Sequence, residues 1–234
     1  PTRTRLMDIN AFVRGDLGWA LPWAGADTIS MVAGTEWRKS NMSSTADSNS
    51  QHGNFSGAGG PTLPIAGQIQ AKEFYTEWGI PIISDMGVLK SFAADVGYRY
   101  SDYKHMGSTD TYKIGLNANL GDMFRLRGGY NRAVRAPNVN ELFATKQIGL
   151  FSGADPCAGP TPTDTAAQCA NTGVTAAQYG HVLDNPASQY NQFTGGNPDL
   201  KPEKADTYTL GFAVTPFQGL EATLDYYEVK IKDT

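Results

Sequence analysis

The sequence has no long hydrophobic run. In its 234 residues, no stretch approaches the roughly 20 consecutive apolar residues that a membrane-spanning helix needs. Helical membrane spans are therefore excluded. Membrane-spanning β-strands are not excluded, because such a strand presents only every second side chain to lipid and keeps a low mean hydropathy, which is -0.37 here.

The sequence is also poor in charge. Charged residues make up 18% of the chain, the net charge is -4, and Lys and Arg are scattered without forming a run. Nucleic-acid-binding domains usually carry a basic patch and a high isoelectric point, whereas the value here is about 5.3. We therefore expect no nucleic-acid partner.

Motifs that carry catalysis are missing as well. The sequence contains no nucleophile elbow, phosphate-binding loop, HExxH helix or dinucleotide-binding glycine pattern. The glycine-rich stretch 57–60 precedes no helical pattern and is typical of a loop. We therefore predict that the protein is not an enzyme and uses no cofactor.

Only two cysteines are present, Cys157 and Cys169, in a stretch rich in Pro, Gly, Thr and Ala. Their proximity predicts a disulfide, which fits an oxidising compartment. Two free thiols or half of a metal site are the alternatives. The three histidines (His52, His105 and His181) lie far apart in sequence, so a zinc site lacks obvious partners.

The two ends of the sequence look incomplete. Residues 1–5 are polar and no apolar segment follows them, so we do not expect them to form a signal peptide. Residues 227–234 look like an unfinished strand. We expect that the chain is cut at both ends.

Strict alternation of side chains is the main structural signal. In residues 111–120, for example, Tyr112, Ile114 and Leu116 alternate with polar residues or glycine, and several charged residues lie inside such segments. The runs reach about 10–16 residues, against a usual five or six in soluble sheets, and a tilted membrane strand needs about 9–11. The predicted strands are 5–18, 27–42, 68–83, 88–100, 111–120, 124–131, 207–214 and 220–226. Pro81 is expected to weaken the third strand near its end.

The connections between these strands alternate in length. Short ones are predicted at 19–26, 84–87, 121–122 and 216–219, and longer ones at 43–67, 102–108 and 138–204. An up-and-down membrane barrel produces this pattern, with short periplasmic turns on one rim and longer extracellular loops on the other. The sequence thus predicts an all-β fold, a transmembrane antiparallel up-and-down β-barrel. In this fold 138–204 is a long extracellular loop and the suspected ligand-binding segment.

Five sequence blocks, in order, resemble the barrel of TonB-dependent outer-membrane receptors. They are GTEWR (34–38), EFYTEWGIP (73–81), GYRYSDY (97–103), FRLRGGYNRAVRAPNVNELF (124–143) and GNPDLKPEKADTYTLGF (196–212). The last two blocks carry the most specific matches. The family-motif residues in them are Arg135, Ala136, Pro137, Glu141, Leu142, Phe143, Asn197, Pro198, Leu200, Pro202 and Glu203.

The resemblance implies that residues 1–234 are about eight consecutive strands of one barrel domain of about 22 strands, with the plug domain and the closing strands outside the chain. It also implies a bacterial outer-membrane location in contact with outer-membrane lipid. The implied function is import of a scarce extracellular ligand, such as a siderophore, cobalamin or a glycan, with energy from the TonB–ExbB–ExbD complex. A self-contained small barrel with a structural or adhesive role is the alternative. A soluble β-sandwich is disfavoured by the strand lengths and the loops.

The chemistry of the motif residues suits barrel construction better than ligand contact. Pro137 has no N–H to donate and is expected to end strand pairing at the rim. Arg135 is expected to pair with Glu141 or Glu203. Pro198 and Pro202 bracket Leu200 and are expected to keep that segment extended before the next strand. Aromatic residues near strand ends could be stacking platforms for a sugar or siderophore, but those that face outward are expected to form an interfacial girdle. They are Trp37, Trp78, Tyr98, Tyr100, Tyr112 and Tyr226.

Overall fold

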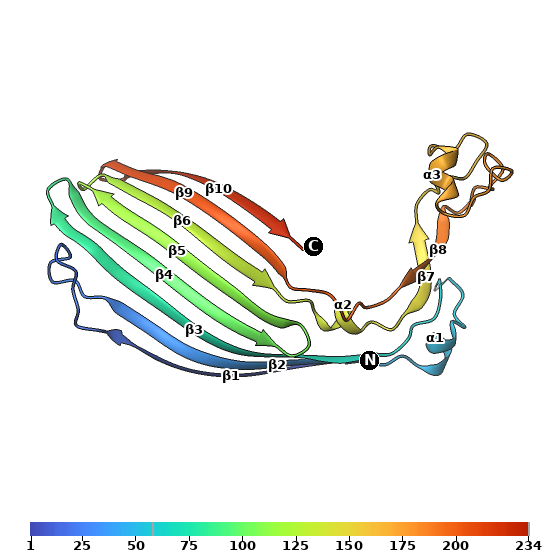
Figure 1. Cartoon of the computed structure of the whole chain (residues 1–234), viewed down its shortest axis with the longest axis horizontal. Helices are drawn as coiled ribbons and strands as arrows, with labels where there is room; N and C mark the ends of the chain where they lie inside the picture. The colour runs from blue at the N-terminus through green and yellow to red at the C-terminus, as the bar shows by residue number, and fades with distance from the viewer. Residues whose placement is uncertain (58, 234) are drawn as a thin grey trace.

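The computed structural model describes residues 1–57 and 59–233, and most of them lie in one curved antiparallel sheet (Figure 1). The sheet has eight strands in the order β1-β2-β3-β4-β5-β6-β9-β10. Their bounds are β1 (Thr2–Asp16), β2 (Ser30–Ser44), β3 (Ile65–Met86), β4 (Leu89–Tyr103), β5 (Gly107–Leu120), β6 (Phe124–Arg135), β9 (Glu203–Phe217) and β10 (Leu220–Lys232). This up-and-down order confirms the predicted fold class.

The remaining elements are short and belong to the connections. Strands β7 (Gln147–Ser152) and β8 (Gln189–Thr194) form a separate hairpin. The helices are α1 (Ser48–His52), α2 (Val139–Phe143) and α3 (Ala166–Ala170). Among the described residues, no helix has the length and apolar character needed to cross a membrane.

All eight alternating segments form strands, but several bounds differ from the prediction. β9 begins at Glu203 rather than at 207, and β10 runs on to Lys232. The predicted end of this strand at residue 83 is wrong, because β3 continues to Met86, but the ladder is disturbed at Pro81, where weakening was expected. The register between β3 and β4 shifts between Pro81 and Ile83, and such a bulge accommodates a residue that cannot donate to the ladder.

The connections gather at two opposite rims of the sheet (Figure 1). We call them the turn rim, where β3–β4, β5–β6 and β9–β10 are joined, and the loop rim, which carries the connections 45–64 and 136–202. Strict alternation of length is not kept. The β4–β5 connection at the loop rim is only 104–106, whereas the β1–β2 connection at the turn rim spans 17–29. The two longest connections nevertheless share one rim, as a membrane barrel requires.

The two faces of the sheet differ in chemistry. Register places Asn10, Glu36, Glu73 and Ser101 in one cross-strand row on what we call the inner face. A hollow of about 900 Å³ lies on that face. The opposite, outer face carries an exposed apolar band made of Ile114, Leu116, Leu126, Leu210, Phe212 and Leu224. A continuous exposed apolar surface on one face and a polar inner face are expected for a barrel wall with lipid on its outside and water on its inside.

Aromatic side chains accompany the apolar band. Register puts all six of the predicted girdle residues on the outer face. Further tyrosines join them, and the ring centroids of Tyr130 and Tyr208 lie 4.9 Å apart, with Tyr112 5.8 Å from Tyr130. Tyr and Trp favour the boundary between lipid tails and headgroups, so this belt marks the level of that boundary on the wall.

The sheet is open. Strands β1 and β10 form its two edges and lie far apart in Figure 1, and within the described residues they do not pair with each other. This disfavours the alternative of a self-contained eight-stranded barrel, which would join its first and last strands. It fits consecutive strands of a larger barrel.

Candidate functional site

Arg135 ties together the two ends of the long connection 136–202. It is the last residue of β6, and its Nε and Nη2 donate to Glu203 Oε2 and Oε1 at 2.8 and 2.6 Å. Its Nη1 donates to both carboxylate oxygens of Glu141 at 3.1 Å. Both partners suggested by the sequence are therefore engaged at once. Pro137 is buried two residues beyond the end of β6, where strand pairing has stopped.

Helix α2 follows directly and is held by the same glutamate. Asn138 caps the helix, its side chain accepting from the N–H groups of Asn140 and Glu141, both at 2.9 Å. In return the Glu141 carboxylate accepts from the Asn138 N–H at 2.7 Å, which completes a capping box. Because a single helical turn is not stable alone, these contacts are what fix α2. The Asn-x-x-Glu spacing of this capping box is visible in the sequence, although the helix itself was not predicted.

The second motif block meets the first at α2. The N–H of Asn197 donates to the Glu141 carbonyl at 2.8 Å, and the N–H of Gly196 donates to the Ala144 carbonyl at 2.8 Å. A Cβ at Gly196 would lie 2.6 Å from the backbone of Leu142, so only glycine fits this approach. We call this cluster of Arg135, Glu141, Asn197 and Glu203 with α2 the loop base.

The other motif residues surround the loop base without forming a ligand site of their own. Pro202 is buried immediately before β9, and Leu200 is 37% exposed. Pro198 lines a hollow of about 370 Å³ together with Leu142 and Phe143. Ala136 is half-buried between Arg135 and Pro137. This placement agrees with a constructional role for the motif.

Helix α2 packs against β3 on the inner face at Gly67, a contact that sequence analysis missed. A Cβ at Gly67 would lie 2.4 Å from Phe143 and 2.9 Å from Val139. Val139 and Leu142 are 5% and 3% exposed, among the most buried apolar residues of the chain. The start of the long connection thus lies against the inside of the wall rather than standing free above it.

Reversing the charge at Arg135 is expected to open the loop base. Arg135→Glu places a third carboxylate beside Glu141 and Glu203, and like charges at this distance repel. In the full-length receptor we expect a lower yield of folded barrel and faster protease cleavage within 138–204, measured by heat-dependent gel mobility and limited proteolysis. Arg135→Lys, which keeps the charge, is the control and should retain most of the yield. An unchanged yield for Arg135→Glu would count against the role of the loop base in assembly.

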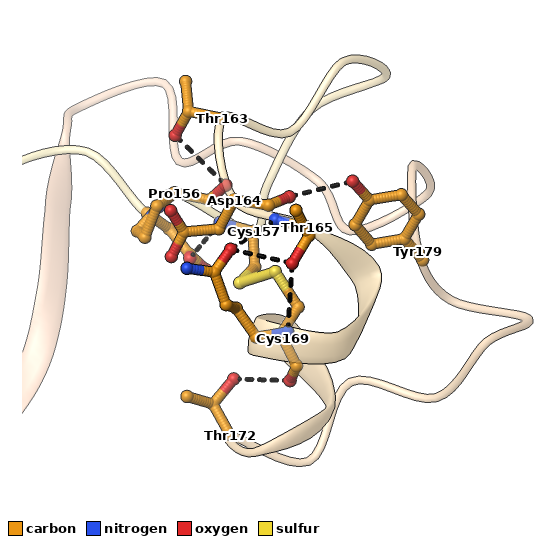
Figure 2. Close-up of a disulfide and its surroundings, with 10 residues drawn as sticks. Pro156, Cys157, Thr163, Asp164, Thr165, Cys169, Thr172 and Tyr179 are labelled. Carbon is orange, nitrogen blue, oxygen red and sulfur yellow. Dashed lines mark hydrogen bonds between the residues drawn. A yellow bond between two sulfur atoms is a disulfide. The ribbon is translucent and has the colours of Figure 1, made fainter.

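Beyond the loop base, the hairpin of β7 and β8 carries a small lobe, residues 153–188 (Figure 1). The Cys157 and Cys169 sulfur atoms are bonded, with Cα atoms 5.7 Å apart, and both side chains are buried (Figure 2). Cys169 lies on α3, which begins with a capping box of Thr165 and Gln168. The Tyr179 hydroxyl donates to the Asp164 carbonyl at 2.8 Å. No cluster of metal-ligating side chains occurs in residues 1–57 and 59–233.

The two long connections touch at the base of this hairpin. The Leu63 N–H donates to Gln147 Oε1 at 3.2 Å, and the Thr145 hydroxyl donates to the Pro64 carbonyl at 2.5 Å. Helix α1, in the first connection, is capped by Asp47, and the Ser50 hydroxyl and amide that donate to this carboxylate lower its pKa. The connections 45–64 and 136–202 therefore form one joined surface at the loop rim.

A charge cluster with two buried carboxylates occupies the inner face below the loop rim. Arg99 Nη1 donates to Glu73 Oε2 at 2.6 Å and to Glu36 Oε2 at 3.1 Å, and Arg38 lies 3.6 Å from each of these carboxylates. The Ser101 hydroxyl donates to Glu73 Oε1 at 2.7 Å. Glu36 and Glu73 are only 8% and 4% exposed. We call Glu36, Glu73, Arg38 and Arg99 the inner charge cluster.

These features define a sector of a transmembrane β-barrel of the receptor type, with a lipid-facing belt, a polar interior and elaborated loops on one rim. A model of the family described as "TonB dependent receptor-like, beta-barrel" matches residues 2–234. The chain belongs to this family, whose members are proteins of the Gram-negative outer membrane. No curated protein sequence matches the chain.

Solved structures agree on the fold. The siderophore receptor PirA from Acinetobacter baumannii superposes with a TM-score of 0.64 at 19% identity, covering 100% of this chain and 28% of that one. A variant of the ferric enterobactin receptor PfeA from Pseudomonas aeruginosa, in complex with enterobactin, gives 0.63 at 20% identity, covering 98% and 27%. PirA from Pseudomonas aeruginosa gives 0.61 at 16%, covering 98% and 32%. The chain thus spans about a third or less of these receptors.

Proposed function

We propose that the chain is a wall sector of an outer-membrane receptor that binds a scarce extracellular ligand and imports it with energy from the TonB–ExbB–ExbD complex. The observation that carries the proposal is the family match over residues 2–234. The asymmetry of the rims supports it, because the loop rim joins two long connections and adds a disulfide-bonded lobe. In this proposal the loop rim faces outward, and the ligand is a siderophore, cobalamin, a glycan or a similar nutrient.

The hairpin and its lobe are the proposed ligand-contacting surface. Ile148 and Phe193 are paired across β7 and β8 and are 54% and 73% exposed, and Phe151 is 49% exposed. Exposed apolar and aromatic side chains on an anchored loop are more typical of recognition than of packing.

The charge of this surface narrows the ligand class. Residues 147–198 contain no Lys or Arg, but they include Asp155, Asp164 and Asp184. Proteins usually hold anionic groups with Arg or Lys. We therefore propose that this sector contacts a neutral or cationic part of the ligand through apolar, amide and hydroxyl groups.

Deleting the hairpin and lobe tests the proposal. In the full-length receptor, replacing 147–194 with a short Gly-Ser linker keeps the contacts of Arg135 with Glu203 and of Asn197 with Glu141. We expect normal barrel yield and loss of uptake of labelled ligand, tested with a panel of iron–siderophore complexes, cobalamin and oligosaccharides. Uptake should also vanish in cells that lack TonB. Uptake that survives the deletion would contradict the binding role, and TonB-independent uptake would contradict the energy source.

A further inference from the structure

The hairpin of β7 and β8 directs backbone groups outward along both of its edges. The N–H of Gly153 donates to the Ser188 carbonyl at 3.0 Å, and this pair continues the register of the hairpin. Because hydrogen-bonded and non-hydrogen-bonded pairs alternate along an antiparallel ladder, this one bond fixes which N–H and C=O groups point away from the partner strand. The outward groups belong to Ile148, Leu150 and Ser152 on β7 and to Gln189, Asn191 and Phe193 on β8.

The outward edge of β7 is covered by the protein itself. A Cβ at Gly60 would lie 2.7 Å from the Ile148 carbonyl oxygen, so the first long connection passes directly against this edge. The Nε2 of Gln192, which lies opposite Gly149, donates to the Leu150 carbonyl at 3.1 Å. The edge of β7 is therefore not available to another chain.

The outward edge of β8 is free. The Gln189 carbonyl at its start accepts from the side-chain amide of Asn185. Beyond it, no hydrogen bond from residues 1–57 or 59–233 reaches the outward N–H and C=O groups of Asn191 and Phe193. Both strands of this hairpin lie within the chain, so its edge differs from those of β1 and β10, where the barrel wall continues.

This free edge lacks the features that usually prevent pairing with another chain. Exposed edge strands commonly carry lysine, proline or a bulge. Strand β8 reads QYNQFT, with no charge and no proline, and its register with β7 has no shift. A row of alternating N–H and C=O groups is complementary to another extended backbone, and the uncharged side chains beside it offer no counter-charge to an ionic ligand.

We propose that the free edge of β8 binds a short oligopeptide with uncharged side chains as an added strand. The inference rests on the proposed role of the hairpin in ligand contact and names the ligand class. Six residues at about 3.3 Å each give an edge of about 20 Å, which suits five or six peptide residues. The backbone of Asn191 and Phe193 supplies the hydrogen bonds. The side chains of Phe193 on one face and Tyr190 on the other select among peptides.

Peptide binding by the purified full-length receptor tests the inference. The probe is a fluorescent, end-capped peptide with the sequence QIGLFS, which is that of β7, the strand already paired with β8. Two isomers of it carry N-methyl groups, either on the first, third and fifth residues or on the second, fourth and sixth. An added strand uses only one of these sets of N–H groups. One isomer should therefore bind like the parent peptide and the other on the order of 100-fold more weakly. Equal binding of the two isomers overturns the inference.

A pair of proline variants locates the site on the receptor. Asn191→Pro removes an outward N–H of β8 and leaves the ladder with β7 intact, because proline fits a strand edge whose N–H faces solvent. It should bind the parent peptide about 30-fold more weakly. Ser152→Pro makes the same change on the edge of β7 and should bind normally. Unchanged amide exchange at Gly159 verifies that the lobe is folded in both variants. Unchanged binding by Asn191→Pro, or an equal loss in Ser152→Pro, overturns the inference.

Amide exchange at Asn191 and Phe193 distinguishes a peptide from another part of the receptor. Both amides should exchange rapidly in the peptide-free receptor and slowly with the probe bound. Protection before the probe is added would mean that another segment of the receptor occupies the edge, which overturns the inference. Uptake of the probe is measured separately in cells with and without TonB. Binding without uptake would contradict import and support the site, whereas uptake of another nutrient without peptide binding would contradict the site alone.

Discussion

Arg99→Leu is expected to destabilise the barrel by about 3 kcal/mol. The substitution removes the cation that bridges Glu36 and Glu73, and the Glu73 side chain is only 2% exposed. Removing one partner of a fully buried ion pair costs about 3–5 kcal/mol, because the remaining charge is left without compensation. Here the carboxylates are buried but the Arg99 side chain is 36% exposed, so solvent screens part of the effect. Arg38 remains 3.6 Å from both carboxylates, which places the effect at the lower end of that range. The measurement is urea unfolding of the full-length receptor in lipid vesicles, with the loss taken from the midpoint at constant slope.

Two further variants isolate the cause. Arg14→Leu removes an arginine that lines the inner hollow and, among the described residues, has no carboxylate within 4.0 Å. It is expected to change the midpoint little. Glu36→Gln with Glu73→Gln should recover most of the loss in the Arg99→Leu background, because the buried groups are then neutral. A loss for Arg99→Leu no larger than that for Arg14→Leu would show that the cluster contributes nothing to stability.

The strands of the wall could be predicted because each one shows its own alternation of apolar and polar side chains. Alternation over ten or more residues fixes both the strand and its two faces, and it sorted Tyr98 and Tyr112 from Arg99 and Lys113 correctly. The lengths of the connections added the up-and-down order of the strands. Bounds were less accurate at the loop rim, where polar residues occupy both faces and alternation fades, as at Glu203 and Lys232.

The contents of the long connections could not be predicted in the same way. Strands β7 and β8 are short and sequence-distant, so neither shows a period that stands out from a polar loop. Helix α2 had a visible signal in the Asn138 to Glu141 spacing. The packing of α2 on Gly67 had no signal in the sequence, because the contact joins residues more than seventy positions apart.

Some of the site contacts could be predicted from the sequence and others could not. The pairing of Arg135 was open to prediction because few carboxylates lie near it in the motif blocks. The inner charge cluster was not, because Glu36, Glu73 and Arg99 come from three strands and meet only once the register is known. A shift of one residue in the strand register would turn these side chains from the inner face to the lipid-facing side. Sequence blocks such as GTEWR thus identify the family without revealing which partners their charges meet.

The second large effect is expected in the lobe. Replacing both cysteines, Cys157→Ser with Cys169→Ser, removes a crosslink of sequence separation 12. The loop-entropy relation gives about 3 kcal/mol for a loop of this size. We expect amide exchange in the lobe to become about 100-fold faster, because opening no longer has to work against the crosslink. Suitable reporters are the N–H of Gly159, bonded to the Val182 carbonyl at 2.8 Å, and that of residue 169, bonded to the Thr165 carbonyl at 3.0 Å.

The barrel itself should not respond to this change. The lobe is joined to the wall through the six-residue strands β7 and β8, so the urea midpoint is expected to stay the same. Thr165→Ala, which removes only a helix cap worth about 1 kcal/mol, is the matched control and should speed exchange about fivefold. Reduction of the wild-type protein should reproduce the double variant. Unchanged exchange in the double variant would mean that the lobe is held by its hydrogen bonds and not by the crosslink. If the lobe contacts ligand as proposed, its loosening must weaken binding as well, because ligand would then have to order it.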